Sequence, residues 1–171
     1  GSTPLILPIK GLSECGFITA HDMLDGKAQI GAKALVVGGG MVGCEAAEFL
    51  AERGHQVAVI EMKDVIGADV VPENKPFLFA NFDKHHVDLR PGAKVSEFFT
   101  DGVSYALADG TEGELRGFDN IILAMGSRSY NPLEETVKEF VPEVIVIGEA
   151  VKSPGNACIS TGEALNAALS L

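Results

Sequence analysis

The sequence predicts an α/β fold, a Rossmann-like βαβ parallel sheet with an antiparallel three-stranded β-meander crossover. Three observations lead to this prediction. Two short, continuously apolar segments, residues 33–37 and 57–60, flank an amphipathic segment at residues 41–53, which is the order of a βαβ unit. A glycine-rich turn joins the first apolar segment to the amphipathic one. Residues 93–118 alternate in polarity and are interrupted by two Asp-Gly pairs, a pattern typical of hairpins.

The composition is that of a globular protein with an acidic surface. A chain of 171 residues with 46% hydrophobic and 22% charged residues can bury one α/β core. The formal net charge is −11, so the surface would repel a nucleic-acid backbone, and we expect no nucleic-acid partner. A bound dinucleotide is also an anion, and it must therefore be held by local backbone dipoles.

The cysteine pattern and the hydropathy exclude several other classes. Cys15, Cys44 and Cys158 form no CxxC pair and no zinc or iron–sulfur spacing, so no metal site is predicted. An odd number of widely spaced thiols fits a reducing cytoplasm. No apolar run approaches the roughly 20 residues that span a bilayer, and the N-terminus shows no signal-peptide pattern. We therefore expect a cytoplasmic protein without a membrane partner.

The N-terminal region is expected to be mostly irregular. Gly1-Ser2 is typical of the residues that remain when an expression tag is removed, which suggests that the chain is a piece of a longer protein. Residues 5–9 are apolar but are interrupted by proline, so they are predicted to be extended. Thr19 is a suitable N-cap for a short helix over residues 20–24.

The periodicity of the remaining chain predicts the other elements. The segment 41–53 is predicted to be a helix, because the apolar residues Val42, Ala46, Phe49 and Leu50 recur at helical spacing. Gly54 provides the left-handed residue after its end. The other predicted elements are helices at residues 72–84 and 161–169, buried strands at 87–89, 121–124 and 144–147, and meander strands at 93–100, 103–108 and 112–118.

The glycine-rich turn reads Gly38-x-Gly40-x-x-Gly43, and each glycine has a physical task. Gly38 allows the tight turn off the strand, Gly40 lets a pyrophosphate approach the backbone, and Gly43 lets the helix pack close to the strand. The free N–H groups of the first helical turn, around Met41 and Val42, would then point at the anion. The motif follows a buried strand and opens an amphipathic helix, which favours dinucleotide binding over a purely structural turn.

An acidic residue completes the motif. Glu61 stands at the end of the second strand, where a carboxylate accepts hydrogen bonds from the adenosine ribose and repels a 2′-phosphate. It favours NAD(H) over NADP(H), although Lys63, two residues further on, would partly offset the repulsion. FAD binds similar motifs, so the motif alone does not choose between NAD(H) and FAD.

No residue pattern predicts acid–base or nucleophilic catalysis. The chain shows no Ser/His/Asp triad and no paired carboxylates in a catalytic context. Cys44 lies beside Gly43 near a helix N-terminus, where a thiol can be activated, but a small buried packing residue is the favoured interpretation. No catalytic residue is therefore predicted.

The order of these motifs resembles a known family. Residues 38–61 (GGGMVGCEAAEFLAERGHQVAVIE), the meander, Ala124-Met125-Gly126 and residues 146–150 (VIGEA) resemble the pyridine-nucleotide half of the flavoprotein disulfide-reductase superfamily. Within it, Thr19-Ala20-His21-Asp22 followed by GGGMVGCE is similar to the C-terminal region of the Old Yellow Enzyme-like NADH:flavin oxidoreductases. That group includes 2,4-dienoyl-CoA reductases and enoate reductases.

The resemblance implies a cofactor set and partners. In that family an FMN- and iron–sulfur-bearing barrel precedes an FAD domain, and the NADH domain is inserted in the FAD domain. Electrons pass from NADH through FAD to an activated double bond. The NADH turn would be Gly38, Gly40 and Gly43, with Glu61 as the ribose ligand and Gly126 near the nicotinamide nucleotide.

The FAD portion would be represented by Gly148 and Glu149, which match the Gly-Asp pair that holds part of the flavin. Two departures matter. Glu149 stands where the family has Asp, and the sequence holds no second GxGxxG for FAD phosphates. The chain thus resembles an NADH domain with remnants of an FAD-binding domain.

The expected organisation follows from this resemblance. Residues 1–30 would be the tag remnant and a linking segment from the FAD domain, residues 31–130 the NAD(H)-binding domain, and residues 131–171 the C-terminal part of the FAD domain. The expected function is that of an NADH-binding fragment of a flavin-dependent oxidoreductase, inactive when isolated. A stand-alone dinucleotide-binding sensor or regulatory module is the alternative.

Overall fold

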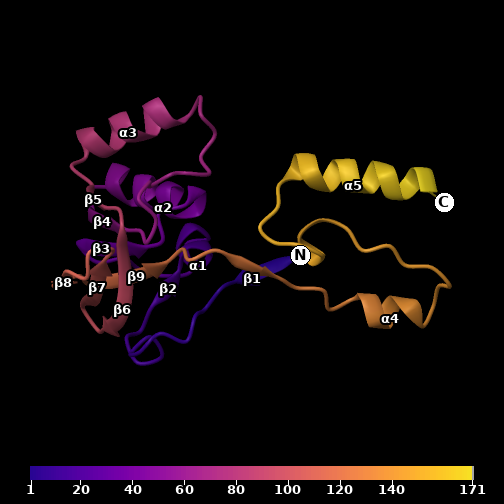
Figure 1. Ribbon diagram of the computed structural model, residues 1–171, viewed down its shortest axis with the longest axis horizontal. Coiled ribbons are helices and arrows are strands. Elements are labelled where there is room, and N and C mark those ends of the chain that lie inside the picture. The colour runs from indigo at the N-terminus through magenta and orange to yellow at the C-terminus, as the bar shows by residue number, and fades with distance from the viewer. Residues whose placement is uncertain (171) are drawn as a thin grey trace. The chain divides into compact units, whose positions relative to one another are not determined.

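The computed structural model describes residues 1–170, and they form two compact units. The central unit is continuous in sequence, from Ile6 to Met125. The terminal unit combines Gly1–Leu5 with the chain from Gly126 onward. Figure 1 shows both units.

A five-stranded parallel sheet forms the middle layer of the central unit. Val37 pairs with both Ile60 and Leu123, so three neighbouring strands end at the same edge of the sheet. This confirms the predicted βαβ unit and the strands that flank it. In spatial order the strands are β2 (Ile18–Thr19), β9 (Asn120–Leu123), β3 (Lys33–Val37), β4 (Gln56–Ile60) and β5 (Asp88–Arg90).

Helices cover one face of this sheet (Figure 1). Val36, Val59 and Ile122 project from three strands into one apolar cluster, where they meet Leu50 and Phe82 of the helices. All five side chains are at most 1% exposed, and burial of this kind is the main source of stability for such layers. The helices are α1 (Ala20–Leu24), α2 (Met41–Glu52) and α3 (Lys75–Lys84).

The predicted meander covers the opposite face. Leu35 and Ile60 alternate with the residues that face the helices, and they pack with Phe98 and Val103 in a second apolar cluster. Because both faces of β3 are covered, four of its five residues are buried, which explains the continuous apolar run in the sequence. The meander consists of β6 (Ala93–Phe99), β7 (Gly102–Leu107) and β8 (Glu112–Leu115), which pair antiparallel.

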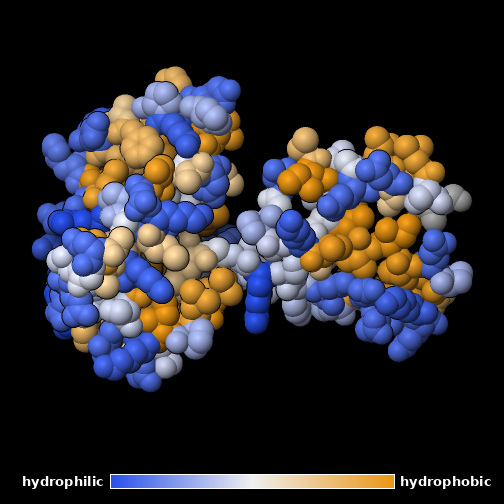
Figure 2. Space-filling view, in the orientation of Figure 1, coloured by the Kyte–Doolittle hydropathy of each residue, from blue (hydrophilic) through white to orange (hydrophobic). Residues whose placement is uncertain are grey.

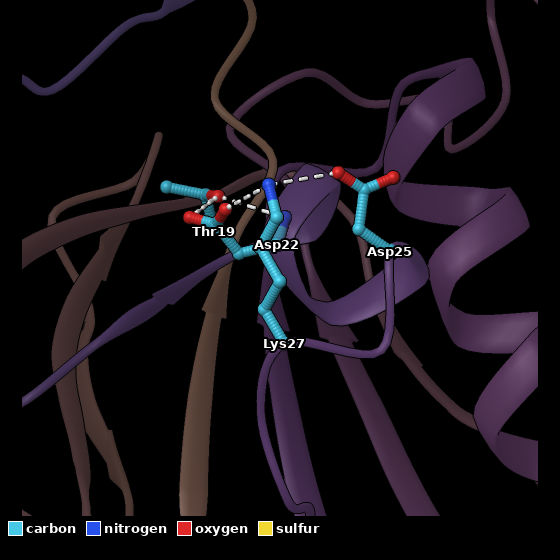
Figure 3. A network of polar contacts seen from close by, with 4 residues as sticks. All are labelled: Thr19, Asp22, Asp25 and Lys27. Atoms are coloured by element: carbon cyan, nitrogen blue, oxygen red, sulfur yellow. Dashed lines mark hydrogen bonds and ion pairs between the residues drawn. The ribbon is translucent and has the colours of Figure 1, made fainter.

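Thr19 caps the N-terminus of α1, as the sequence predicts. The Thr19 hydroxyl accepts a hydrogen bond from the Asp22 amide at 3.1 Å and donates one to the Asp22 carboxylate at 2.8 Å. Lys27 contacts both Asp22 and Asp25 (Figure 3). The Thr19 hydrogen bond and then Lys27 lower the pKa of the Asp22 carboxyl. This reciprocal cap fixes where β2 turns into α1.

Helix α3 is shorter than the helix predicted for residues 72–84. It begins at Lys75 and not at Pro72. A helix starting at residue 72 would place Pro76 in its second turn, where the missing N–H would break the hydrogen-bond ladder. In the observed helix Pro76 lies in the first turn, where its amide needs no partner.

The terminal unit contains little regular packing. Strand β1 (Ser2–Pro4) pairs antiparallel with β10 (Ser127–Ser129). The rest is a short α4 (Glu134–Lys138), a 3₁₀ turn η1 (Gly148–Ala150) and the longer α5 (Ala157–Ser170). Within residues 1–170 we find no helix with the length and apolar content to cross a membrane.

The predicted buried strand at residues 144–147 is wrong. These residues form no strand, and Ile145 and Ile147 are 44% and 36% exposed. An extended apolar segment becomes a strand only where another strand satisfies its backbone groups, and no strand of the described residues pairs with this one.

The last helix begins four residues before the predicted start at Thr161. None of its described residues is buried, and Leu165 and Leu169 are 60% and 77% exposed. Figure 2 shows the apolar side chains that gather on the surface of this unit.

Candidate functional site

The predicted glycine turn lies at the edge of the sheet where β3, β4 and β9 end. It joins the end of β3 to the start of α2. The Gly38 amide donates to the carbonyl oxygen of Ile60 at 2.9 Å, and the Ala124 amide donates to that of Val37 at 2.8 Å. The carboxyl ends of the strands thus surround the turn, which is where α/β sheets bind ligands.

Two of the three motif glycines are required by the fold itself. Gly38 has a positive φ of 106°, and a Cβ there would lie 2.2 Å from the Ala124 carbonyl oxygen. A Cβ on Gly43 would lie 1.8 Å from the Gly38 carbonyl oxygen. Either side chain would force the first turn of α2 away from the sheet.

The third motif glycine is different. Gly40 has an extended backbone that any residue adopts. The nearest atoms to a Cβ at this position are the Asp69 carboxylate oxygens, at 3.3 and 3.4 Å. That carboxylate belongs to an exposed side chain that can move aside. The fold therefore tolerates a side chain at position 40.

The N-terminus of α2 begins directly after Gly40. The amides of Met41 and Val42 lie in the first helical turn, so they have no partner within the helix. The Met41 amide donates instead to the Asp69 carboxylate at 2.8 Å. The role of Asp69 is not predictable from the sequence, because Asp69 lies 28 residues from Met41 in a loop without a recognisable pattern.

Glu61 lies beside the turn, as predicted from its place after β4. It is the one buried charged residue of the described chain, with 9% of its surface exposed. One carboxylate oxygen accepts from the Gly39 amide at 2.6 Å, and the other accepts from the Lys63 amide at 2.8 Å. Each carboxylate oxygen can accept more than one hydrogen bond, so capacity remains for a ligand hydroxyl.

Cys44 is a packing residue, as the sequence analysis favoured. Its side chain is fully buried against the glycine turn, and its thiol lies 3.5 Å from the Gly39 carbonyl oxygen. Burial, with a smaller contribution from the charges of Asp69 and Glu61, raises the pKa of this thiol to about 12. A protonated thiol is a poor nucleophile.

The remaining predicted site residues lie in the terminal unit. Gly126 and Gly148 have positive φ angles of 99° and 65°. The Glu149 carboxylate accepts hydrogen bonds from the Gly155 amide at 2.9 Å and the Ser2 hydroxyl at 2.8 Å, and these contacts lower its pKa.

The structure thus brings one group of predicted residues together in the central unit: Gly38, Gly40, Met41, Val42, Gly43 and Glu61. Their ligand contacts, and those of the three residues in the terminal unit, stay predictions. Among residues 1–170, no group of three or more His, Cys, Asp or Glu side chains is arranged to hold a metal ion.

Comparison with known proteins identifies the family. Residues 1–149 match the family described as pyridine nucleotide-disulphide oxidoreductase. The chain belongs to this family. Its members use NAD(P)H and FAD. The fold and the glycine turn are therefore those of an oxidoreductase family with nucleotide-binding, Rossmann-type domains.

Individual relatives are much longer than this chain. It is 34% identical to an NADH oxidase of Thermoanaerobacter brockii, over 88% of this chain and 24% of the relative. It is 28% identical to a cinnamate reductase of Clostridium sporogenes, over 89% of this chain and 23% of that protein.

A solved structure shows the same fold. A 2-naphthoyl-CoA reductase in complex with 2-naphthoyl-CoA superposes with a TM-score of 0.81 at 27% identity. The match covers 89% of this chain and 23% of that one. The chain thus spans about a quarter of the length of each of these three proteins.

The close contact at Gly43 leads to a prediction about stability. We expect Gly43→Ala to lower the free energy of unfolding by about 3 kcal/mol, because the new Cβ overlaps a backbone oxygen that cannot move freely. The matched control is Gly40→Ala in the same turn. This variant should change the free energy of unfolding by less than about 1 kcal/mol. Denaturant titration of both variants measures the difference, and equal losses would contradict this account of the turn.

Proposed function

We propose that this chain is the NADH-binding part of a flavin-dependent oxidoreductase. It holds NADH at the glycine turn and positions the nicotinamide for hydride transfer to FAD. The observation that carries the proposal is Gly40, a motif position with an ordinary extended backbone, where the closest neighbour of a Cβ is the movable carboxylate of the exposed Asp69. A glycine that the fold does not need is explained by a ligand that must approach the backbone.

The contacts around the turn fit a pyrophosphate. The first-turn amides of α2 point out of the helix N-terminus, and the helix dipole adds a partial positive charge there. These backbone groups provide attraction that does not depend on the net charge of −11. The chain's own residues thus bind and orient the nucleotide, and the chemistry is supplied by the bound nicotinamide and flavin.

The position of Glu61 supports NADH over NADPH. Its carboxylate is fixed by two backbone amides, so it cannot easily turn away from a 2′-phosphate. A fixed carboxylate accepts hydrogen bonds from ribose hydroxyls and repels a phosphate group at the same place. Lys63 supplies its amide to Glu61, while its side chain is exposed.

The rest of the enzyme lies outside this chain. We assign residues 31–130 to the NADH domain, residues 131–171 to the C-terminal part of an FAD domain, and residues 1–30 to a linking segment whose β2 and α1 pack in the central unit. The absent strand partner of residues 144–147 and the exposed leucines of α5 support this assignment, since both would be covered by more of the FAD domain. Gly126 would then lie near the nicotinamide nucleotide, and Gly148 with Glu149 near the flavin.

The substrate class is proposed from the relatives. A cinnamate reductase and a 2-naphthoyl-CoA reductase are named for substrates with a carbonyl-conjugated unsaturated system. We propose that the full-length protein reduces an activated, enoyl-type double bond. Its further partner would be an FMN- and iron–sulfur-bearing barrel, as in the Old Yellow Enzyme-like oxidoreductases.

The Gly40→Ala variant tests the proposed site. We expect it to remain folded, yet to bind NADH at least about tenfold more weakly, because its Cβ occupies space that the pyrophosphate needs. Calorimetric titration measures the dissociation constant, and thermal unfolding of the same sample shows that the fold is retained. Unchanged NADH affinity in a folded variant would exclude this binding mode.

The Glu61→Gln variant tests nucleotide choice. Because a charged acceptor is lost, we expect NADH binding to weaken by about tenfold or more and the preference for NADH over NADPH to fall. Glu45→Gln, which removes the same charge from an exposed position on α2, is the matched control. Titration with NADH, NADPH and FAD gives the comparison, and tight FAD binding without a response to NADH would refute the proposal.

The isolated chain should bind NADH without oxidising it. The chain carries one glycine-rich phosphate turn, and the proposal assigns that turn to NADH, so no hydride acceptor is held beside the nicotinamide. The absorbance of NADH at constant protein concentration measures turnover directly. Steady oxidation without an added flavoprotein partner would show that the chain is not a fragment of this kind.

A further inference from the structure

The anion site at the start of α2 already has an occupant that belongs to the chain. One Asp69 carboxylate oxygen accepts from the Met41 amide at 2.8 Å. The same carboxylate stands over Gly40, 3.3 and 3.4 Å from the place of a Cβ there. A dinucleotide pyrophosphate is expected to use this amide and the same face of Gly40. The carboxylate and the pyrophosphate therefore compete for one place.

The segment that carries Asp69 is anchored on both sides of it. The Gly67 amide donates to the Gly39 carbonyl oxygen at 2.6 Å. Ile66 and Val70 are buried in the helix-facing apolar cluster, with 5% and 9% of their surfaces exposed. Asp69 itself is exposed. Its backbone is thus held beside the turn, while its side chain can rotate into solvent without disturbing the core.

We propose that Asp69 is an internal competitor of the dinucleotide at the glycine turn. Its carboxylate takes the place of the pyrophosphate in the free chain, and it must turn away when a dinucleotide binds. This inference rests on the proposed function, because it assumes that NADH binds at the glycine turn.

The competition lowers the affinity for every anion at this place. Inorganic pyrophosphate and NADH must both displace the Asp69 carboxylate from the Met41 amide, so both lose the same factor in affinity. NADH gains in addition the ribose contacts expected at Glu61, whose carboxylate accepts from the Gly39 amide of the same turn. NADH binding should therefore remain measurable in the unaltered chain, where binding of the free anion is too weak to detect.

The Asp69→Asn variant tests the proposal in the 171-residue chain. Asparagine can still accept from the Met41 amide, since Asn and Asp cap helices about equally well, but it carries no charge. We expect the dissociation constant for NADH to fall about 3- to 10-fold, and binding of inorganic pyrophosphate to become measurable by calorimetry. Asp64→Asn removes the same charge from the same loop and is the matched control, because Asp64 makes no hydrogen bond to the α2 N-terminus among the described residues.

The contact itself is measured separately from binding. Amide hydrogen exchange at Met41 should become faster in Asp69→Ala and stay unchanged in Asp64→Asn. If Asp69→Asn binds NADH no more tightly than Asp64→Asn, or more weakly than the unaltered chain, the inference is overturned. A different outcome would refute the proposed function and not this inference. In that outcome amide exchange at Met41 is faster in Asp69→Ala, but neither the unaltered chain nor any variant binds NADH.

Discussion

The contact between the first turn of α2 and the carbonyl oxygen of Gly38 is the constraint on which the site depends. Without a Cβ at position 43, the helix starts directly against the end of β3. This places the helix N-terminus at the sheet edge where β4 and β9 also end. The glycine turn can therefore contact both Glu61 and Asp69. The Gly39 amide donates to the Glu61 carboxylate, and the Met41 amide donates to the Asp69 carboxylate.

The same geometry gives several residues two tasks at once. Glu61 fixes the turn through the Gly39 amide and also presents its charge at the proposed ribose position. Its backbone continues the strand pairing, since its amide donates to the Arg90 carbonyl oxygen at 3.0 Å. Both carboxylate oxygens of Glu61 accept hydrogen bonds from backbone amides. The side chain therefore keeps its position whether or not a ligand is bound, and precise recognition requires this preorganisation.

The sequence predicts the central unit well because its signals are local. The apolar runs of β3 and β4, the helical spacing in α2 and the Asp-Gly turns of the meander can each be recognised within a few residues of sequence. The glycine motif and Glu61 were found in the same way. Asp69 could not be found, because the contact that places it at Met41 exists only once the loop has packed on the turn.

The wrong prediction of a strand in the terminal unit has a different cause. An apolar run such as residues 144–147 carries the same local signal whether or not a neighbouring strand exists, so its sequence alone cannot reveal a missing partner. In the central unit, α3 begins three residues later than predicted, because Pro76 has no amide hydrogen to donate and fits only the first turn of the helix.

The pairing of β1 with β10 also bears on the order of folding. It joins Ser2 to Ser129, a separation that would make loop closure entropically costly in an unfolded chain. The central unit, in contrast, is one continuous stretch of chain from Ile6 to Met125. Once it has folded, residues 6 and 125 are no longer joined by a flexible loop, and the two strands can pair at little further entropic cost. We therefore expect β1 and β10 to pair only after the central unit has folded.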